Sequence, residues 1–331
     1  MEGPPAATFA SNDYLGLSQH PAVLAAAHAA LDRWGAGAGA ARLVAGSRAV
    51  HSELEADLAA WKGTEAALLF PIGYAANLGV LTTFGVDSAR ILSDERNHAS
   101  IVDGCRLARA SVEVYRHADL DHVAKLLADG GPTVVVTDTV FSMDGDEAPV
   151  AGLAALCRDN DALLVLDEAH AVLGPHPDLT GVEHLRVGTL SKTLGSVGGF
   201  VAGSRRFVDL LVNRARSFIF TTAPAPADAA AALAALRVLR SAEGDALTAR
   251  LRSHVERVRP GHPSPIVPLI LGDEEAALAA AATLAARRIV VPAIRPPTVP
   301  PGTSRLRVSL SAAHTDEQVT ALIEALGALS A

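Results

Sequence analysis

Short apolar runs and longer helical patterns alternate along the first two thirds of the chain. The apolar runs lie at residues 66–70, 91–93, 133–137, 163–166 and 199–202. Such runs are typical of strands buried on both faces of a sheet. Helical patterns lie at residues 21–32, 50–62 and 225–239, from the segment PIGYAAN onward, and near residues 98–109. This alternation predicts an α/β fold with a mostly parallel sheet and helices on both of its faces.

The pattern changes after about residue 241. Strand-like runs then lie at residues 266–271, 289–291 and 306–310, and helical patterns lie at residues 274–287 and 315–329. We therefore expect an N-terminal segment at 1–34, a large domain at 35–241 and a smaller C-terminal α+β domain at 242–331. The proline-rich segment at residues 295–302 fits either an ordered turn or a linker.

Composition narrows the class of protein. The chain has 331 residues, of which 50% are hydrophobic and 19% charged, enough for a large core. The net charge of −8 argues against nucleic acid or an anionic membrane as the main partner. Cys105 and Cys157 form no disulfide framework. Without a signal-like start or an apolar stretch of about 18 residues, the sequence predicts a cytoplasmic protein. The two cysteines lack zinc-finger spacing, and no metal site is expected.

The segment VGTLSKTLGSVGGF at residues 187–200 holds a lysine in an unusual setting. Lys192 stands between Ser191 and Thr193, after a strand-like VGTL and before a glycine-rich turn. Most lysines are solvated surface residues. A loop of small, hydroxyl-bearing residues, however, suits an amine approached by a flat ligand. Such a lysine can form a Schiff base with an aldehyde, which is how proteins hold pyridoxal 5′-phosphate (PLP).

An acidic residue stands where a partner for this ligand is expected. Asp167 ends the apolar run of LLVLDEAH, and ligands favour the carboxyl ends of parallel strands. A carboxylate there can pair with a protonated pyridine nitrogen. The alternatives are a helix cap or a magnesium ligand, but the latter requires a Gly-Lys-Ser/Thr phosphate loop that the sequence lacks. His170 suits a hydrogen bond to the ring oxygen, a proton shuttle or a structural role.

Other polar positions add weaker signals. Gly73 and Tyr74 open a helix directly after a strand, which suits a phosphate or a plain turn. His98 is either a ring stacked on a flat ligand or a surface histidine, and Ser142 and Thr189 offer hydroxyls to a cofactor. The loop GAGAGAARLVAGS at residues 35–47 follows a helical pattern, not a strand, which disfavours a dinucleotide site. Its glycines suit a close approach of the backbone to a ligand or a partner subunit.

The order of these motifs resembles one enzyme family. SNDYLGL at residues 11–17, the GAGAGAARLVAGS loop, HSELE, GYAAN, NHAS, FSMDGD, LDEAHA and TLSKTLG occur in the order seen in the α-oxoamine synthases, which are PLP enzymes. The resemblance covers nearly the whole chain. It implies the aspartate-aminotransferase-like fold, type I of the PLP enzymes. That fold has a large domain around a mostly parallel seven-stranded sheet and a smaller C-terminal α+β domain.

The resemblance also implies roles for the cofactor residues. Lys192 would hold PLP as a Schiff base and later move the α-proton of the substrate. Asp167 would pair with the pyridine nitrogen, and His98 would stack on the ring. The remaining contacts to the cofactor are assigned to Gly73, Tyr74, Ser142, His170, Thr189 and, across a homodimer interface with shared sites, Thr221 or Thr222. The catalytic set is Lys192, His98, Asp167 and His170.

The substrate residues follow from the same resemblance. Arg307 would fork onto the amino-acid carboxylate, a bidentate contact that lysine makes poorly, with Asn12 assisting. Thr298 would lie beside the acyl substrate. Family members usually carry an arginine for the acyl donor before SNDYLGL. The ten residues that precede this motif here include no Arg or Lys, so either the start of the chain is trimmed or another residue, such as Arg295, serves the acyl substrate.

One segment indicates the substrates. IRPPTVPPGTSRLRVSLSAAHT at residues 294–315 most resembles family members that join L-alanine to a pimeloyl thioester of CoA or acyl-carrier protein. The alternatives are a family member that uses glycine or serine with another acyl donor, and a non-catalytic subunit of the same fold. Such a subunit is expected to lack the lysine, which is present here as Lys192.

Overall fold

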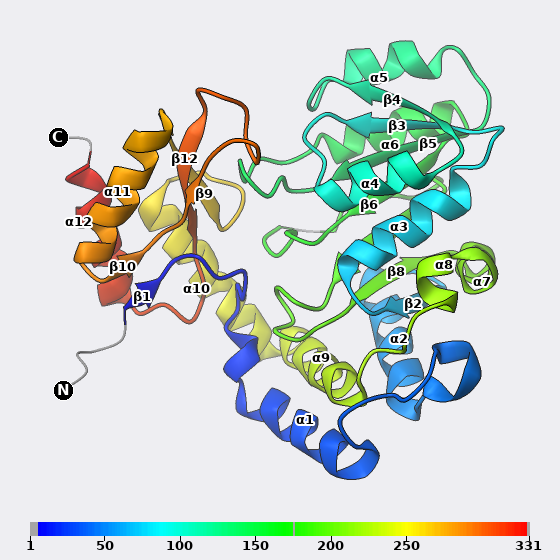
Figure 1. Ribbon diagram of the computed structural model, residues 1–331, viewed down its shortest axis with the longest axis horizontal. Helices are drawn as coiled ribbons and strands as arrows, with labels where there is room; N and C mark the ends of the chain where they lie inside the picture. Colours follow the sequence, from blue (N-terminus) through cyan, green and yellow to red (C-terminus); the bar gives the residue numbers. More distant parts are fainter. Residues whose placement is uncertain (1–5, 175, 330–331) are drawn as a thin grey trace.

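The computed structural model describes residues 6–174 and 176–329. Its larger part is built on a seven-stranded sheet of order β2-β8-β7-β6-β5-β3-β4 (Figure 1). The strands are β2 (Ala66–Phe70), β3 (Arg90–Asp94), β4 (Ser111–Tyr115), β5 (Thr133–Asp138), β6 (Leu163–Asp167), β7 (His184–Thr189) and β8 (Gly199–Gly203). Only β8 runs antiparallel to its neighbours β2 and β7. The sheet is therefore mostly parallel, which confirms the predicted fold class.

Helices cover both faces of this sheet. Val134 and Val136 of β5 pack in a core with α3 (Gly73–Phe84), α4 (Ala99–Leu107), α7 (Arg205–Arg214) and α8 (Arg216–Ile219). Val135 points to the opposite face, where α5 (Leu120–Leu127) and α6 (Val150–Asp159) lie. Near β2 and β8, α2 (Ala49–Lys62) and α9 (Pro226–Leu239) cover that second face. Because successive side chains of a strand alternate between two buried faces, β5 needs a continuous apolar sequence.

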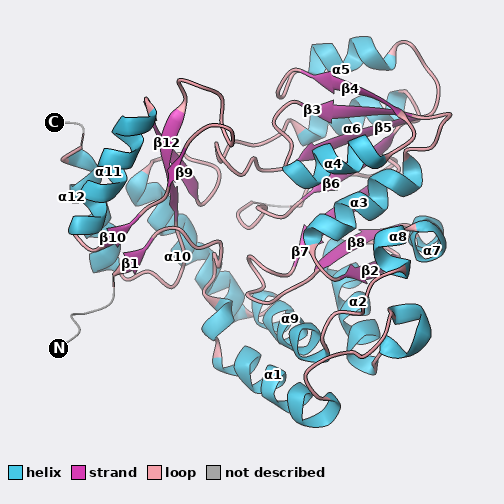
Figure 2. Cartoon of the chain, in the orientation of Figure 1, coloured by secondary structure: helices cyan, strands magenta, loops and turns pink. Residues whose placement is uncertain are grey.

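The smaller part contains a three-stranded antiparallel sheet of order β11-β12-β9 (Figure 2). Its elements are β9 (Ile266–Gly272), β11 (Ala293–Ile294), β12 (Ser304–Ser309), α10 (Ala242–Val258), α11 (Glu274–Ala286) and α12 (Asp316–Gly327). The N-terminal β1 (Ala7–Thr8) pairs in parallel with β10 (Ile289–Val290), so the start of the chain belongs to this side of the molecule. Residues 295–303 form the ordered connection between β11 and β12, which favours the turn over the linker.

The segment between β1 and β2 connects the two parts. After the short helix η1 (Leu17–Gln19), α1 (Pro21–Trp34) packs along α9 (Figure 1). The glycine-rich loop comes next, and η2 (Arg42–Gly46) lies within it. The glycine-rich loop therefore follows a helix, as the sequence pattern predicted. Among the described residues, no helix has the length and apolar character that crossing a bilayer requires.

Candidate active site

The carboxyl ends of β5, β6 and β7 meet at one edge of the large sheet. Asp138, the last residue of β5, is the register partner of Asp167, the last residue of β6. β7 ends at Thr189, three residues before Lys192. These strand ends border a cavity of about 210 Å³. The predicted residues that line it are Gly73, Tyr74, His98, Asp167, His170, Thr189 and Lys192.

The amine of Lys192 is held within this cavity. Its Nζ lies 2.9 Å from Nε2 of His170. The pKa of Lys192 is lowered, chiefly because burial disfavours the ammonium form, while the carboxyls of Asp167 and Asp138 oppose that shift. The pKa of His170 is also lowered, well below 6.5, by burial and then by the charge of Lys192. The site thus favours a free amine beside a neutral imidazole, which is the form of lysine that attacks carbonyls.

Asp167 is buried and oriented by two donors. Asn77 Nδ2 donates to Asp167 Oδ2 at 2.6 Å, and the backbone N–H of Ala169 donates to Oδ1 at 2.9 Å. The same Asn77 nitrogen is 2.8 Å from Oγ of Ser100. Asn77 stands in the second turn of α3, in the motif GYAAN, and no local sequence pattern marks it as a site residue. Donors of this kind hold the carboxylate in one orientation toward the cavity.

Asp138 is a second buried carboxyl that sequence reasoning missed. Its Oδ2 accepts the backbone N–H of His98 at 2.7 Å. The pKa of Asp138 is raised well above its usual range, first by burial and then by the charge of Asp167. Burial and its neighbour therefore favour the protonated form of Asp138. Its hydrogen bond from the His98 backbone fixes the start of α4, where His98 is the N-cap residue.

The N-terminus of α3 lies unusually close to β8. A Cβ on Gly199 would stand 2.6 Å from Cα of Gly73, and a Cβ on Gly73 would stand 3.3 Å from Cβ of Thr189. Glycine at both positions therefore lets the first turn of the 12-residue helix α3 reach the cavity wall. The first N–H groups of a helix have no acceptor within it and favour anions such as phosphate.

These features fit PLP. The cavity offers a desolvated amine, a buried and oriented carboxylate and a helix N-terminus seated against β8, and His98 stands at its exposed border. An amine, an acid for the ring nitrogen and donors for the phosphate are the groups that this cofactor requires of a protein.

Arg307 enters the neighbourhood from the smaller part of the molecule. This buried side chain of β12 lies 3.3 Å from Asn12 Oδ1 through both Nη1 and Nη2. Its Nη1 also donates to Ser309 Oγ at 2.7 Å, and its Nε donates to the carbonyl of Ser142. The structure thus brings together three predicted residues, Asn12, Ser142 and Arg307, that are far apart in the sequence.

Several predicted residues lie outside the cavity lining. Thr221, Thr222, Arg295 and Thr298 are not among the described residues that border the 210 Å³ cavity, and Ser142 contacts Arg307 through its backbone only. Arg295 and Thr298 are exposed, and Nη1 of Arg295 lies 3.8 Å from Oε2 of Glu274. Their proposed roles toward substrates or a partner subunit stay predictions.

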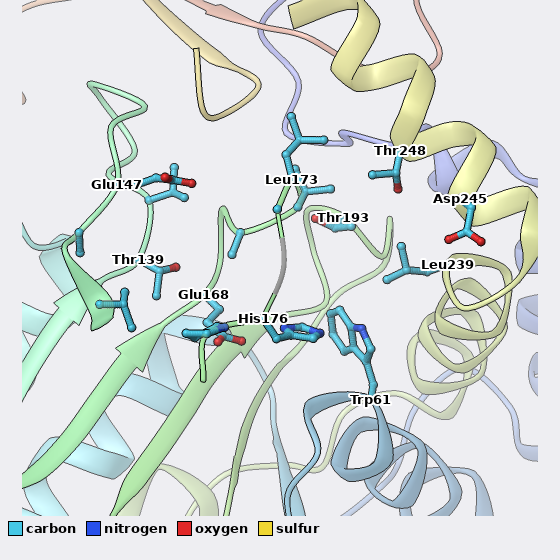
Figure 3. Close-up of a pocket in the computed structure, with 17 residues that line it drawn as sticks. Trp61, Thr139, Glu147, Glu168, Leu173, His176, Thr193, Leu239, Asp245 and Thr248 are labelled. Atoms are coloured by element: carbon cyan, nitrogen blue, oxygen red, sulfur yellow. The ribbon is translucent and has the colours of Figure 1, made fainter. Parts of the chain in front are cut away.

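A larger cavity of about 410 Å³ lies between the same sheet edge and α10 (Figure 3). Its walls carry Trp61, Glu168, His176 and Asp245. Glu168 is already paired with the buried cations Lys62 and Arg186. The smaller cavity is the candidate active site because it holds the desolvated amine of Lys192.

Comparisons with known proteins agree with this site. The model of the family described as aminotransferase class I and II matches residues 5–326. An 8-amino-7-oxononanoate synthase from Methylobacterium sp. (strain 4-46) is 50% identical over 334 residues, which cover 98% of this chain and 87% of that protein. One from Anaeromyxobacter dehalogenans is 53% identical over 343 residues, which cover 96% of this chain and 85% of that protein.

Two solved structures are similar in fold. A serine palmitoyltransferase from S. paucimobilis with bound PLP has a TM-score of 0.94 and 30% identity, and the match covers 98% of this chain and 87% of that one. An 8-amino-7-oxononanoate synthase from Francisella tularensis has a TM-score of 0.82 and 27% identity, with 98% and 97% covered.

Proposed function

Because the chain belongs to the class I and II aminotransferase family, we propose that it is an 8-amino-7-oxononanoate synthase that uses PLP. The observation that carries this proposal is its identity of about half to synthases of that name over nearly all of its length. The enzyme would condense L-alanine with pimeloyl-CoA or pimeloyl-carrier protein. It would release CO2, free CoA or carrier protein, and 8-amino-7-oxononanoate, a step of biotin biosynthesis.

Named residues of the cavity would hold the cofactor. Lys192 would bind its aldehyde carbon, Asp167 would pair with its ring nitrogen, and the first turn of α3 at Gly73 and Tyr74 would receive its phosphate. When bound, PLP supplies an electron sink for the bond that breaks at the α-carbon of the amino acid. His98, His170, Ser142 and Thr189 are proposed as further contacts.

Residues of the chain carry out the proton transfers and bind the substrate. The free amine of Lys192 takes the α-proton of alanine and later returns a proton, which its lowered pKa favours near neutral pH. Asp167, oriented by Asn77, would face the ring nitrogen of the cofactor. Arg307 binds the alanine carboxylate through its guanidinium fork. In the structure, both nitrogens of this fork contact Oδ1 of Asn12.

A homodimer would complete the site. Large apolar side chains are exposed on η2, where Leu43 and Val44 are 54% and 80% exposed, and Phe220 beside it is 70% exposed. η2 contacts α8, the helix that Phe220 directly follows, so these exposed side chains belong to neighbouring segments. We propose that a second copy covers this face and that Thr221 or Thr222, which follow Phe220, reach the partner's cofactor. Light scattering of the purified protein tests the dimer.

One observation favours a second candidate, a synthase that acts on another amino acid. The serine palmitoyltransferase matches with a higher TM-score, 0.94, than the 8-amino-7-oxononanoate synthase structure at 0.82. Identity of about 50% to the 8-amino-7-oxononanoate synthases, against 30% to that serine palmitoyltransferase, decides for the first candidate.

A substrate panel tests the assignment. The PLP-loaded protein is given L-alanine, glycine or L-serine with pimeloyl-CoA, acetyl-CoA or palmitoyl-CoA, and thiol release and the amino-ketone product are measured. We expect the highest kcat/KM for L-alanine with pimeloyl-CoA. A preference for glycine or serine with another thioester, with no product from alanine and pimeloyl-CoA, would overturn the assignment while leaving PLP binding intact.

A further inference from the structure

Tyr14 links the carboxylate-binding side of the site to Lys192. It belongs to SNDYLGL, between β1 and η1, and its side chain is fully buried. Its hydroxyl lies 2.6 Å from Nδ1 of His170, whose Nε2 lies 2.9 Å from Nζ of Lys192. The same hydroxyl lies 3.2 Å from Oδ1 of Asn12. One phenol proton therefore has two acceptors within reach, and its position decides what His170 can do.

The contacts favour the imidazole as the acceptor of that proton. Oδ1 of Asn12 already accepts from Nη1 and Nη2 of Arg307, and it is the more distant of the two acceptors. Burial raises the pKa of Tyr14 to about 12, so the phenol keeps its proton at neutral pH. When the phenol donates to Nδ1, a neutral His170 must carry its own hydrogen on Nε2.

We propose that Tyr14 is a positioning residue that fixes His170 in the tautomer with hydrogen on Nε2, so that the imidazole donates toward Lys192 and the group that Lys192 holds. In this tautomer Nε2 cannot accept a hydrogen bond from an ammonium group, so His170 favours the free amine of Lys192. The inference rests on the proposed function in one respect, because that function is what gives the free amine of Lys192 a role.

The first test reads the tautomer directly. The full chain is labelled with 15N-histidine, and long-range 1H–15N spectra are recorded with and without PLP, with His170 assigned by its loss in His170→Gln. We expect Nε2 to carry the hydrogen in the unmutated chain. In Tyr14→Phe, loss of one hydrogen bond should move the tautomer ratio toward the Nδ1–H form by about fivefold or more. If Nδ1 of His170 carries the hydrogen in the unmutated chain, the proposal is wrong, and no variant is needed to show it.

The second test measures how the protonation of the Lys192 amine depends on pH. The rate at which PLP attaches to the cofactor-free chain is followed by absorbance between pH 6 and 10. In Tyr14→Phe we expect the midpoint of this profile to rise by about one unit, because His170 can then accept from the ammonium form. At pH values below both midpoints, that rise lowers the free-amine fraction, and with it the rate, about tenfold.

Tyr115 provides the matched control. It is also buried, and its hydroxyl makes one long contact of 3.5 Å to the carbonyl of Val136. Tyr115→Phe removes a buried hydroxyl in the same way and should leave both the His170 tautomer and the pH profile unchanged. An unchanged tautomer in Tyr14→Phe, or an equal change in Tyr115→Phe, would overturn the proposal. Neither measurement uses alanine or a thioester, so a failed substrate panel would leave the test of Tyr14 unaffected.

Discussion

Lys192 is one of three lysines in the chain, and each has a different environment. Lys62 is buried in an ion pair with Glu168, and Lys125 is exposed on α5. Only Lys192 combines burial with a lowered pKa and an open cavity. Borohydride reduction of the PLP-loaded protein followed by peptide mapping should therefore place the label at Lys192 alone.

We expect Lys192→Ala to fold and to lose turnover by at least about 10⁴-fold, because the variant lacks both the amine that binds the cofactor and the base. Product formation and a thermal melt measure the two effects. Lys125→Ala, which removes an exposed amine, is the control and should keep full activity. Turnover in Lys192→Ala within tenfold of the unmutated enzyme would show that another group does this work.

Asp167→Asn should bind PLP but turn over about 10²-fold more slowly, since a neutral amide cannot stabilise a protonated ring nitrogen. Steady-state rates and the absorbance of the bound cofactor check this. Asp159→Asn, an exposed carboxyl at the end of α6, removes a charge elsewhere and should change neither. Full turnover in Asp167→Asn would refute the assigned role.

At the residue scale, the sequence predicted the groups that stand at strand ends and missed those that support them. Lys192, Asp167 and His170 follow or end apolar runs, so their positions could be inferred from strand direction. Asn77 and Tyr14 could not be, because each depends on a partner far along the chain. Asn77 is 90 residues from Asp167, and Tyr14 is 156 residues from His170. No local pattern encodes such a contact.

The element that most directly shapes the cavity is α3, through its contact with β8. In Gly199→Ala the new Cβ would stand 2.6 Å from backbone atoms of Gly73, so the helix start must move. We expect PLP affinity to fall at least tenfold and stability to fall by about 1–3 kcal/mol. PLP titration and urea unfolding measure these changes. Gly327→Ala, where a Cβ meets nothing within 4 Å, should alter neither.

The loop that follows β5 is tied down by His117. Its Nδ1 lies 3.0 Å from Asp94 and its Nε2 lies 2.7 Å from Asp146. Burial lowers the pKa of His117, but the hydrogen bonds and charges of Asp146 and Asp94 outweigh burial and raise the pKa to about 9. This folded-state pKa lies above the ordinary 6.5, so the stabilisation is complete below pH 6.5 and is lost as the pH rises through 9.

The free energy of unfolding of the unmutated chain should therefore exceed that of His117→Gln most at pH 6, and the difference should shrink toward pH 9.5. Urea unfolding of both proteins at pH 6, 7.5 and 9.5 checks the trend. A difference that stays constant or grows with pH would contradict the charged form of His117.

Among the elements, those buried on both sides were the easiest to predict. β5 and β6 lie inside the sheet and read as continuous apolar runs. The edge strand β4 was missed because its sequence SVEVY leaves Val112 and Val114 40% and 59% exposed, so no such run forms. The helices α5, α6 and α7 were not assigned either, although their apolar residues are spaced to cover one face, as in other amphipathic helices.

At the scale of the molecule, the order of motifs indicated the family and the fold, but not how the N-terminal strand pairs with the smaller part. β1 pairs with β10, which places Ala7 beside Ile289. Two-residue strands carry too little pattern to predict such a pairing. The division of the chain at residues 34 and 241 stays a prediction, because no measurement separates the units.

The two parts are joined by a buried ion pair that offers such a measurement. Arg305 of β12 contacts Asp144 in the loop after β5, and Asp144 also lies 3.4 Å from Nη1 of the half-exposed Arg96. Asp144→Asn leaves the buried Arg305 without a countercharge and should destabilise the protein by about 3–5 kcal/mol. Arg305→Met leaves Asp144 with Arg96 and should cost less.

The double variant should be more stable than the sum of the single effects predicts, by at least about 1 kcal/mol, because neither charge is then left unpaired. Urea unfolding followed by near-UV and far-UV circular dichroism measures the cycle. If the two signals separate in Asp144→Asn but coincide in the unmutated chain, the pair couples the unfolding of the two parts. Strict additivity of the single variants would instead mean that the ion pair contributes nothing to the docking of the two parts.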